Sequence, residues 1–308
     1  MLSCARSLNV DKVVVVAGST GTGKTKLAVA LARALDGEII SGDSMQVYKG
    51  MDIGTAKVTM EEMEGVPHHL IDIQDPMEPY DVFQFQRLCR QTIHEIRSRG
   101  HLPIICGGTG LYLKAALYDY QFETRPQDLQ RRQELEQEEA GVLWHRLEQA
   151  DPESARKIHP NNKKRVIRAL MRAESGTTKS GQEALQQHKP IYDVFWLGVE
   201  VENNQEALKA RIEEMDRRGL EEEVKRIFSD PRSWQATSFA GIGYKEWKPY
   251  LEGTATKEEV LQQIFIHTRQ YARRQKTWFR HQMPMRWYHP DQYEQILQDV
   301  KGWLNGNQ

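Results

Sequence analysis

The fold of this 308-residue chain is decided by Gly18-Ser19-Thr20-Gly21-Thr22-Gly23-Lys24-Thr25. This stretch matches G-x-x-x-x-G-K-[ST], follows the apolar run 13–17 and opens a helical pattern over 26–35. A buried strand that enters a glycine-rich turn and then a helix directs backbone N–H groups at one point, which suits a phosphate. Lys24 adds a positive charge there, and Thr25 offers a hydroxyl to Mg²⁺. A glycine-rich turn without a ligand is the alternative, but the flanking strand and helix favour a di- or triphosphate site.

The composition is that of an ordinary globular chain, with 39% hydrophobic residues and a net charge of -1. No apolar run approaches the roughly 18 residues that a membrane span needs, and the N-terminus lacks a secretory pattern. We therefore expect a cytoplasmic protein that crosses no membrane. Cys4, Cys89 and Cys106 are too far apart in sequence for a disulfide framework or a C-x-x-C metal site, so we expect inert thiols.

Alternating strand and helix patterns in the first third predict a parallel sheet that is covered by helices on both faces. Strand patterns cover 12–17, 38–41 and 102–106, and a later one over 194–201 is expected to rejoin the sheet. Two helices are expected to begin with capping boxes, one formed by Asp81 with Gln84 and one by Thr256 with Glu259.

Between about 124 and 175 the pattern is of charged helices without a strand. Asp151 followed by proline predicts a helix start there. The expected fold is therefore α/β, a P-loop NTPase-like parallel sheet flanked by helices, with a helical insertion domain. Residues 1–120 and 190–308 would form the P-loop catalytic core with C-terminal helices, and residues 121–189 the insertion.

Polar residues follow two of the predicted strands, where ligands bind in doubly wound sheets. Asp43-Ser44-Met45-Gln46 follows 38–41, and Gly107-Gly108-Thr109-Gly110 follows 102–106. A turn or helix-cap role for Asp43 and a simple tight turn around Thr109 are the alternatives.

A kinase would carry an aspartate at the end of an apolar strand to hold Mg²⁺. The strand pattern 102–106 instead runs into Gly-Gly, and Asp72 is a weak candidate for that role. This departure argues against γ-phosphoryl transfer. His68 and His69 are interpreted as structural rather than metal-binding, because neighbours in sequence rarely chelate together.

Two basic clusters stand out in a chain that is neutral as a whole. They suit a selective polyanion binder, with solvated helix faces as the alternative. The clusters are Lys163, Lys164, Arg165, Arg168 and Arg172, and Arg269, Arg273, Arg274, Lys276 and Arg280.

In a series of blocks along nearly the whole chain, the sequence resembles the tRNA dimethylallyltransferase family, also called tRNA isopentenyltransferase, of bacterial type. The blocks are 18–25, 40–48, 51–57, 67–72, 107–112, 159–170, 242–246 and 269–280. Ala240 and Ala207 depart from the family pattern. Nothing resembles the zinc-finger extension of the eukaryotic relatives, so we expect no zinc.

The resemblance implies transfer of a dimethylallyl group from dimethylallyl diphosphate to N6 of the adenine 3′-adjacent to the anticodon, with release of diphosphate. Asp43 would act as the base, and Thr109 would hydrogen-bond near the reacting amine or the diphosphate. Lys24 and Arg211 would stabilise the leaving diphosphate, together with Mg²⁺ at Thr25.

The resemblance also implies contacts with the tRNA anticodon stem-loop. The expected residues are Asp43, Ser44, Met45, Gln46, Thr109, Arg132, Lys164, Arg165, Val166, Ile167, Arg168, Arg273, Arg274, Lys276 and Arg280. The spacing of Trp278 and Phe279 favours core positions over stacking on a base. We expect a monomer.

Two other functions are compatible with the phosphate loop. A small-molecule P-loop kinase would consume a γ-phosphate, whereas a non-catalytic RNA-binding protein that uses nucleotide as a switch would not need Asp43. Product formation from dimethylallyl diphosphate separates the transferase from both.

Overall fold

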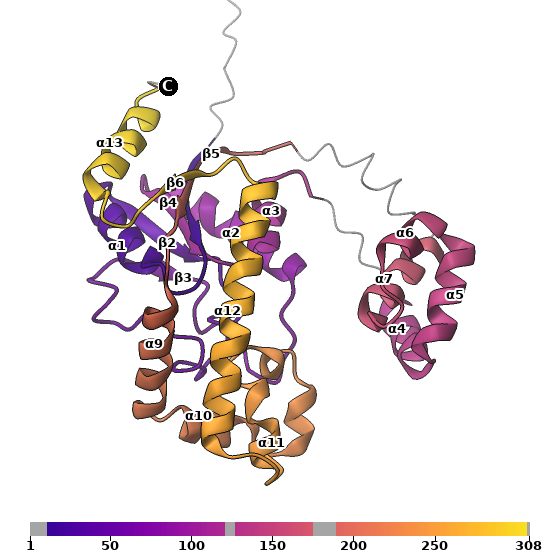
Figure 1. Ribbon diagram of the computed structural model, residues 1–308. Helices are drawn as coiled ribbons and strands as arrows, with labels where there is room; N and C mark the ends of the chain where they lie inside the picture. The colour runs from indigo at the N-terminus through magenta and orange to yellow at the C-terminus, as the bar shows by residue number, and fades with distance from the viewer. Residues whose placement is uncertain (1–10, 121–126, 175–188, 307–308) are drawn as a thin grey trace, which may run out of the picture. The chain divides into compact units, whose positions relative to one another are not determined.

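The computed structural model describes residues 11–120, 127–174 and 189–306. The chain divides into two compact units: the larger unit comprises Met1–Tyr118 with Pro190–Gln308, and the smaller unit comprises Asp119–Lys189. Figure 1 shows the larger unit as a sheet surrounded by helices and the smaller one as a group of helices. Each unit has a hydrophobic core of its own.

Six parallel strands form the sheet, in the order β3-β2-β4-β1-β5-β6. Their bounds are Lys12–Gly18 (β1), Gly37–Ser41 (β2), His68–His69 (β3), Leu102–Gly107 (β4), Asp193–Val199 (β5) and Arg286–Tyr288 (β6). In the central strand, Val14 lies opposite Ile104 on one side and Phe195 on the other. The four predicted strands are confirmed, and β5 rejoins the sheet beside β1. Strands β3 and β6 are too short to leave a periodic signal.

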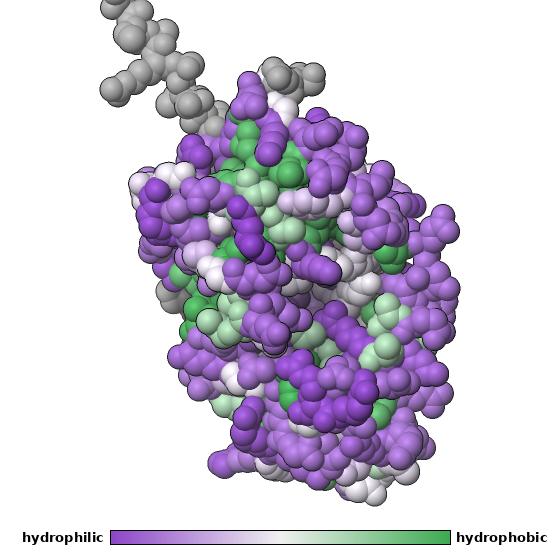
Figure 2. Space-filling model, turned by 90° about the vertical axis from the view of Figure 1, so that its left-hand side faces the viewer, coloured by the Kyte–Doolittle hydropathy of each residue, from purple (hydrophilic) through white to green (hydrophobic). Residues whose placement is uncertain are grey.

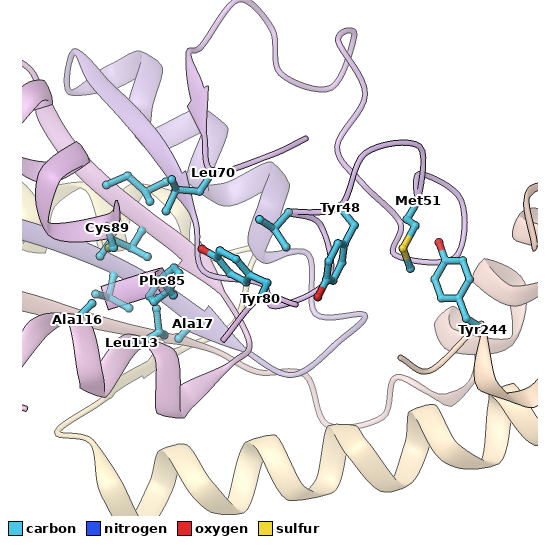
Figure 3. Packing of buried hydrophobic residues seen from close by; sticks show 14 of the residues in the cluster. Ala17, Tyr48, Met51, Leu70, Tyr80, Phe85, Cys89, Leu113, Ala116 and Tyr244 are labelled. Carbon is cyan, nitrogen blue, oxygen red and sulfur yellow. The ribbon is translucent and has the colours of Figure 1, made fainter. Parts of the chain in front are cut away.

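Helices cover both faces of the sheet because successive side chains of a strand point to opposite sides. Val14 and Val16 pack with α1 (Lys24–Ala34) and α13 (Tyr293–Leu304). Val13, Val15 and Ala17 belong to the core that includes α2 (Val82–Ser98) and α3 (Gly110–Leu117). Figure 3 shows Ala17 close to Phe85 of α2 and to Leu113 and Ala116 of α3. The central strand is thereby buried on both sides.

A group of helices lies beyond one end of the sheet (Figure 1). It contains α9 (Gln205–Arg217), α10 (Leu220–Phe228), α11 (Lys248–Leu251) and the 3₁₀ turns Pro231–Gln235, Ser238–Ala240 and Lys245–Trp247. The long helix α12 (Lys257–Gln282) connects this group with the sheet and contacts α9, α3 and β1. Both predicted capping boxes are confirmed, at the starts of α2 and α12.

The smaller unit is helical in its described residues, as predicted. It consists of α4 (Gln127–Gln137), α5 (Ala140–Ala150), α6 (Pro152–Lys157) and α7 (Lys163–Glu174). Asp151 caps α6, accepting a hydrogen bond from the backbone N–H of Ser154 at 3.1 Å. The core of this unit joins Leu143 and Leu147 of α5 to Val166 and Leu170 of α7.

Within the described residues, no helix is both long enough and apolar enough to cross a membrane. The surface agrees with the charged composition. Figure 2 shows mostly hydrophilic residues on the face that carries α1, α9 and α13, with smaller hydrophobic areas among them.

Candidate active site

A cavity of about 760 Å³ opens in the larger unit where β1, β2 and β4 end. The phosphate loop, the segment after β2, α9 and α12 all contribute to its lining. This is the position at which doubly wound sheets bind ligands. It brings together residues from distant parts of the chain that were predicted for one site. Among them are Lys24, Thr25, Asp43, Gln46, Arg211 and Arg274.

The phosphate loop depends on its glycines for different reasons. Gly21 and Gly23 have φ angles of 81° and 82°, in the left-handed region that favours glycine. A Cβ at Gly18 would lie 2.5 Å from the carbonyl oxygen of Val199, so β5 approaches too closely for a side chain. The Thr22 hydroxyl donates to the carbonyl oxygen of Ser19 at 2.9 Å and closes the loop.

Helix α1 begins at Lys24, two residues earlier than the predicted helical pattern. Lys24 and Thr25 therefore lie in its first turn, where free N–H groups and the helix dipole favour an anion. The Lys24 ammonium donates to the carbonyl oxygen of Ser19 at 3.3 Å. The ammonium therefore lies over the loop, in a position that suits phosphate oxygens.

Lys24 and Arg211 place two cations at the cavity. Burial lowers the pKa of both groups, and the negative charge of Asp43 opposes this in each case. Lys24 is partly exposed as a whole residue, but its ammonium is densely surrounded by protein. Among the described residues, neither cation has a carboxylate within 4.0 Å. Both are free to neutralise a bound polyanion.

Asp43 uses one carboxylate oxygen to shape its own turn. Its Oδ1 accepts hydrogen bonds from the backbone N–H groups of Met45 at 2.8 Å and Gln46 at 3.4 Å. Its Oδ2 accepts none from the residues that the structure describes. Asp43 therefore has the turn role suggested as an alternative and still presents a free oxygen as a proton acceptor.

Thr109 joins the ends of β4 and β2. Its Oγ1 accepts a hydrogen bond from the backbone N–H of Ser44 at 3.3 Å. It occupies the cap position of α3 but makes no side-chain capping bond there. Thr109 therefore lies next to the Asp43 turn, although it is not itself part of the cavity lining.

Gln46 is already engaged within the protein. Its Nε2 lies 3.4 Å from the carbonyl oxygen of Thr55 and 3.3 Å from that of Ala56, and its Oε1 accepts from the Ser41 hydroxyl at 3.3 Å. These bonds hold the segment 51–57 against the segment after β2. Gln46 is thus part of the cavity wall as well as a candidate RNA contact.

The wall segment 51–57 is held from behind by Glu223 of α10, whose residue is 5% exposed. Its carboxylate accepts from the backbone N–H groups of Asp52, Ile53 and Gly54 at 2.9, 2.8 and 3.0 Å, and from the Tyr244 hydroxyl at 2.7 Å. Figure 3 shows Tyr244 beside Met51, at the start of this segment. In the sequence, Glu223 belongs to an acidic run that looks like a solvated helix face, so no local signal marks it.

We expect Glu223→Gln to lower the free energy of unfolding by about 2–4 kcal/mol, because four donors lose a charged acceptor that is itself buried. Urea unfolding at neutral pH measures the change. Glu222→Gln is the matched control, since Glu222 is the exposed neighbour on the same helix. Equal stability of the two variants would show that the Glu223 carboxylate does not hold the wall.

The site has no carboxylate at the position where a kinase would carry one. β4, which lies beside β1, ends with Cys106 and Gly107, and burial raises the pKa of the Cys106 thiol to about 11. Asp72 pairs with the Lys57 ammonium at 2.5 Å instead. Cys106 lines the cavity, a position that its sequence context did not predict.

The two neighbouring histidines have protein partners. His69 Nε2 lies 2.6 Å from the buried Glu38, and His68 Nδ1 lies 2.8 Å from the carbonyl oxygen of Val66. No group of three metal-ligating side chains occurs within 11–120, 127–174 and 189–306.

The predicted RNA contacts on α12 divide into two kinds. Arg273 and Arg274 are exposed, and Arg274 reaches the cavity rim, with its guanidinium 5.8 Å from the centre of the Tyr271 ring. Lys276 and Arg280 instead pair with Glu200 at 3.1 and 2.8 Å. Their charges are therefore partly neutralised within the protein.

In the smaller unit, Lys164, Arg165 and Arg168 are exposed on α7, and Arg132 is exposed on α4, where it pairs with Glu136 at 2.9 Å. The structure corrects the expectation for two neighbours. Val166 and Ile167 are 0% and 3% exposed and pack in the core of this unit, so their side chains do not form an RNA-facing surface. The apolar stripe of the helix explains this, because one face must be buried.

The chain matches a protein-family model described as IPP transferase over residues 46–282. A tRNA dimethylallyltransferase of Geobacillus thermodenitrificans (strain NG80-2) is 46% identical over 307 residues, 96% of this chain and 97% of that relative. One from Bacillus subtilis (strain 168) is 45% identical over 283 residues, 90% of each.

Solved structures agree with these matches. The crystal structure of a tRNA delta(2)-isopentenylpyrophosphate transferase from Staphylococcus epidermidis has a TM-score of 0.71 and 38% identity, covering 97% of this chain and 100% of that one. A eukaryotic dimethylallyltransferase acting on tRNA has a TM-score of 0.83 and 28% identity, covering 97% of this chain and 80% of that one. The phosphate loop, the cavity beyond the strand ends and these matches lead to one conclusion: the chain belongs to the IPP transferase family, which includes the tRNA dimethylallyltransferases.

Proposed function

We propose that this enzyme transfers the dimethylallyl group of dimethylallyl diphosphate to N6 of the adenine 3′-adjacent to the anticodon in tRNA. The observation that carries the proposal is the pairing of opposite charges in one cavity. Two cations, Lys24 and Arg211, lie near Asp43, and within the described part of the chain neither has a carboxylate partner and one Asp43 oxygen accepts no hydrogen bond. The two cations suit a diphosphate, and the carboxylate of Asp43 suits a base.

In the reaction, the bond between C1 of the dimethylallyl group and the bridging oxygen breaks, and its electron pair leaves with the diphosphate. Lys24 and Arg211 stabilise the charge that develops on this leaving group. A new bond forms between C1 and N6 of adenine, while the N6 proton passes to Asp43. A base is needed because the N6 lone pair is delocalised into the ring and makes the amine a weak nucleophile.

Mg²⁺ fits the donors at the phosphate loop. Thr25 is exposed in the first turn of α1 and lines the cavity, so its hydroxyl can join diphosphate oxygens and water around the ion. When bound, Mg²⁺ would supply further charge neutralisation to the leaving diphosphate. Lys24 keeps its role at the same oxygens.

For the tRNA, we propose that the exposed cations of both units contact backbone phosphates of the anticodon stem-loop. These cations are Arg132, Lys164, Arg165, Arg168, Arg273 and Arg274. The acceptor adenine must leave its stack to enter the cavity, and RNA loops permit this at a cost of roughly a few kcal/mol. We expect the enzyme to act in the cytoplasm as a monomer.

The test is incubation with dimethylallyl diphosphate, Mg²⁺ and unmodified tRNA, followed by digestion and mass spectrometry of the nucleosides. One adenosine is expected to gain a single C5H8 unit at N6. A tRNA with guanine in place of that adenine is the matched control and should remain unmodified. Absence of the product, with ATP consumed in its place, would contradict the proposal and favour a kinase.

A further inference from the structure

Helix α12 approaches the turn after β4 closely enough to exclude side chains from two glycines. A Cβ at Gly108 would overlap the amide nitrogen of Gln275, and a Cβ at Gly110 would overlap the ring of Trp278. Neither glycine has a positive φ angle. The two glycines therefore serve the contact with α12, where Gln275 and Trp278 lie one helical turn apart.

Gln275 contributes both its amide oxygen and its amide nitrogen to this contact. Its Oε1 accepts a hydrogen bond from the backbone N–H of Thr20 at 3.1 Å, and its Nε2 donates to the carbonyl oxygen of Gly108 at 2.9 Å. The residue is 6% exposed. One buried side chain therefore joins the phosphate loop to the turn that carries Thr109.

The two loops lie on different sides of the proposed reaction, one at the leaving diphosphate and the other at the acceptor amine. The phosphate loop would hold the diphosphate, while Thr109 contacts the N–H of Ser44, next to the proposed base Asp43. Attack on C1 requires the two partners to be aligned, and a displacement of about 1 Å costs roughly 10²-fold in rate. A side chain that holds one loop in place against the other is therefore expected to raise the rate of transfer.

We propose that Gln275 is a positioning residue that sets the phosphate loop against the Thr109 turn for dimethylallyl transfer. The inference rests on the proposed function, because it concerns the alignment of the two substrates. An amide is required because it holds an acceptor oxygen and an N–H donor in one fixed plane, and the contact uses both. A thioether offers neither, and a carboxylate offers no donor to the Gly108 carbonyl oxygen.

The Gln275 amide also satisfies two backbone groups that would otherwise lack a hydrogen-bond partner. Without Gln275, the N–H of Thr20 and the carbonyl oxygen of Gly108 would both lose their partner. The phosphate loop would then be free to shift so that these two groups form hydrogen bonds with other partners. Asn204 still binds the carbonyl oxygen of Thr20 at 2.9 Å, so the loop keeps one anchor and the fold is preserved.

The experiment compares Gln275→Met with wild type in single-turnover reactions at saturating dimethylallyl diphosphate and tRNA. We expect the transfer rate to fall about 10²-fold, with the dissociation constant for tRNA changed less than about twofold. Gln263→Met, at an exposed position of the same helix, is the control and should match wild type. If wild type transfers the group and Gln275→Met does so at the same rate, Gln275 has no positioning role. If wild type forms no product, the proposed function itself fails.

Gln275→Glu separates positioning from simple loss of packing. A protonated carboxyl has the shape of the amide and the same donor and acceptor, whereas the carboxylate repels the Gly108 carbonyl oxygen. Burial favours the neutral acid and raises the pKa of the new carboxyl. The rate of Gln275→Glu, divided by that of wild type at each pH, is therefore expected to rise as the pH falls. A ratio that does not change with pH would overturn the proposal.

Discussion

The Asp43→Asn variant is expected to bind tRNA as wild type does and to lose about 10²–10⁴-fold in the rate of transfer. The amide oxygen of asparagine can still accept from the backbone N–H groups of Met45 and Gln46, so the turn is preserved. The side chain loses only its capacity to take the N6 proton. Single-turnover transfer and tRNA binding are measured separately.

Asp75→Asn is the matched control for this prediction. Asp75 forms the same kind of turn, with its Oδ1 accepting from the N–H of Met77 at 2.8 Å, but it lies outside the cavity lining. Its variant should keep the full rate. A wild-type rate in Asp43→Asn would remove Asp43 from the role of base.

The Lys24→Met variant is expected to lose about 10²–10³-fold in kcat/KM while its ligand-free form unfolds at the same or a higher temperature. Burial holds the pKa of the Lys24 ammonium below its usual value, so the folded protein bears a cost for the charge when no diphosphate is present. Methionine has a similar length and no charge to desolvate. The residue would thus serve binding and catalysis at the expense of stability.

The stability difference between Lys24→Met and wild type is expected to depend on pH in a defined direction. Because the pKa of folded Lys24 is lowered, the cost is present in full below that pKa and is lost as the pH rises from it toward the usual pKa of a lysine. The stability of Lys24→Met relative to wild type should therefore decline at alkaline pH. Thermal unfolding from neutral to alkaline pH checks this, with the exposed Lys49→Met as the control. A Lys24→Met protein that is clearly less stable than the control at neutral pH would contradict the account.

The parts of the fold that the sequence predicts correctly are those with local causes. The strand 12–17 is an unbroken apolar run before a glycine turn, and the starts of α2 and α12 carry complete capping boxes. Such signals depend on neighbours within a few residues. These elements can therefore be predicted without the tertiary structure.

The contacts that hold the site in place cannot be predicted from local sequence, because they join residues that are distant in the chain. Glu223 accepts hydrogen bonds from the segment 51–57, Gln275 binds Thr20, and Glu200 pairs with Lys276 and Arg280. Each looks like an ordinary polar residue of a helix or loop. Val166 and Ile167 differ from these residues, because the resemblance implies RNA contacts for them, whereas the local helical stripe places both side chains in a core.

In the proposed reaction, the phosphate loop holds a diphosphate that leaves intact. This step is tested most directly by running the transfer reaction with dimethylallyl diphosphate that carries ¹⁸O in the bridge between C1 and phosphorus. Cleavage of the C1–O bond predicts that all of the ¹⁸O appears in the released diphosphate and that the tRNA gains C5H8 without phosphorus. Recovery of the ¹⁸O in dimethylallyl alcohol, or transfer of phosphorus to an acceptor, would contradict the account.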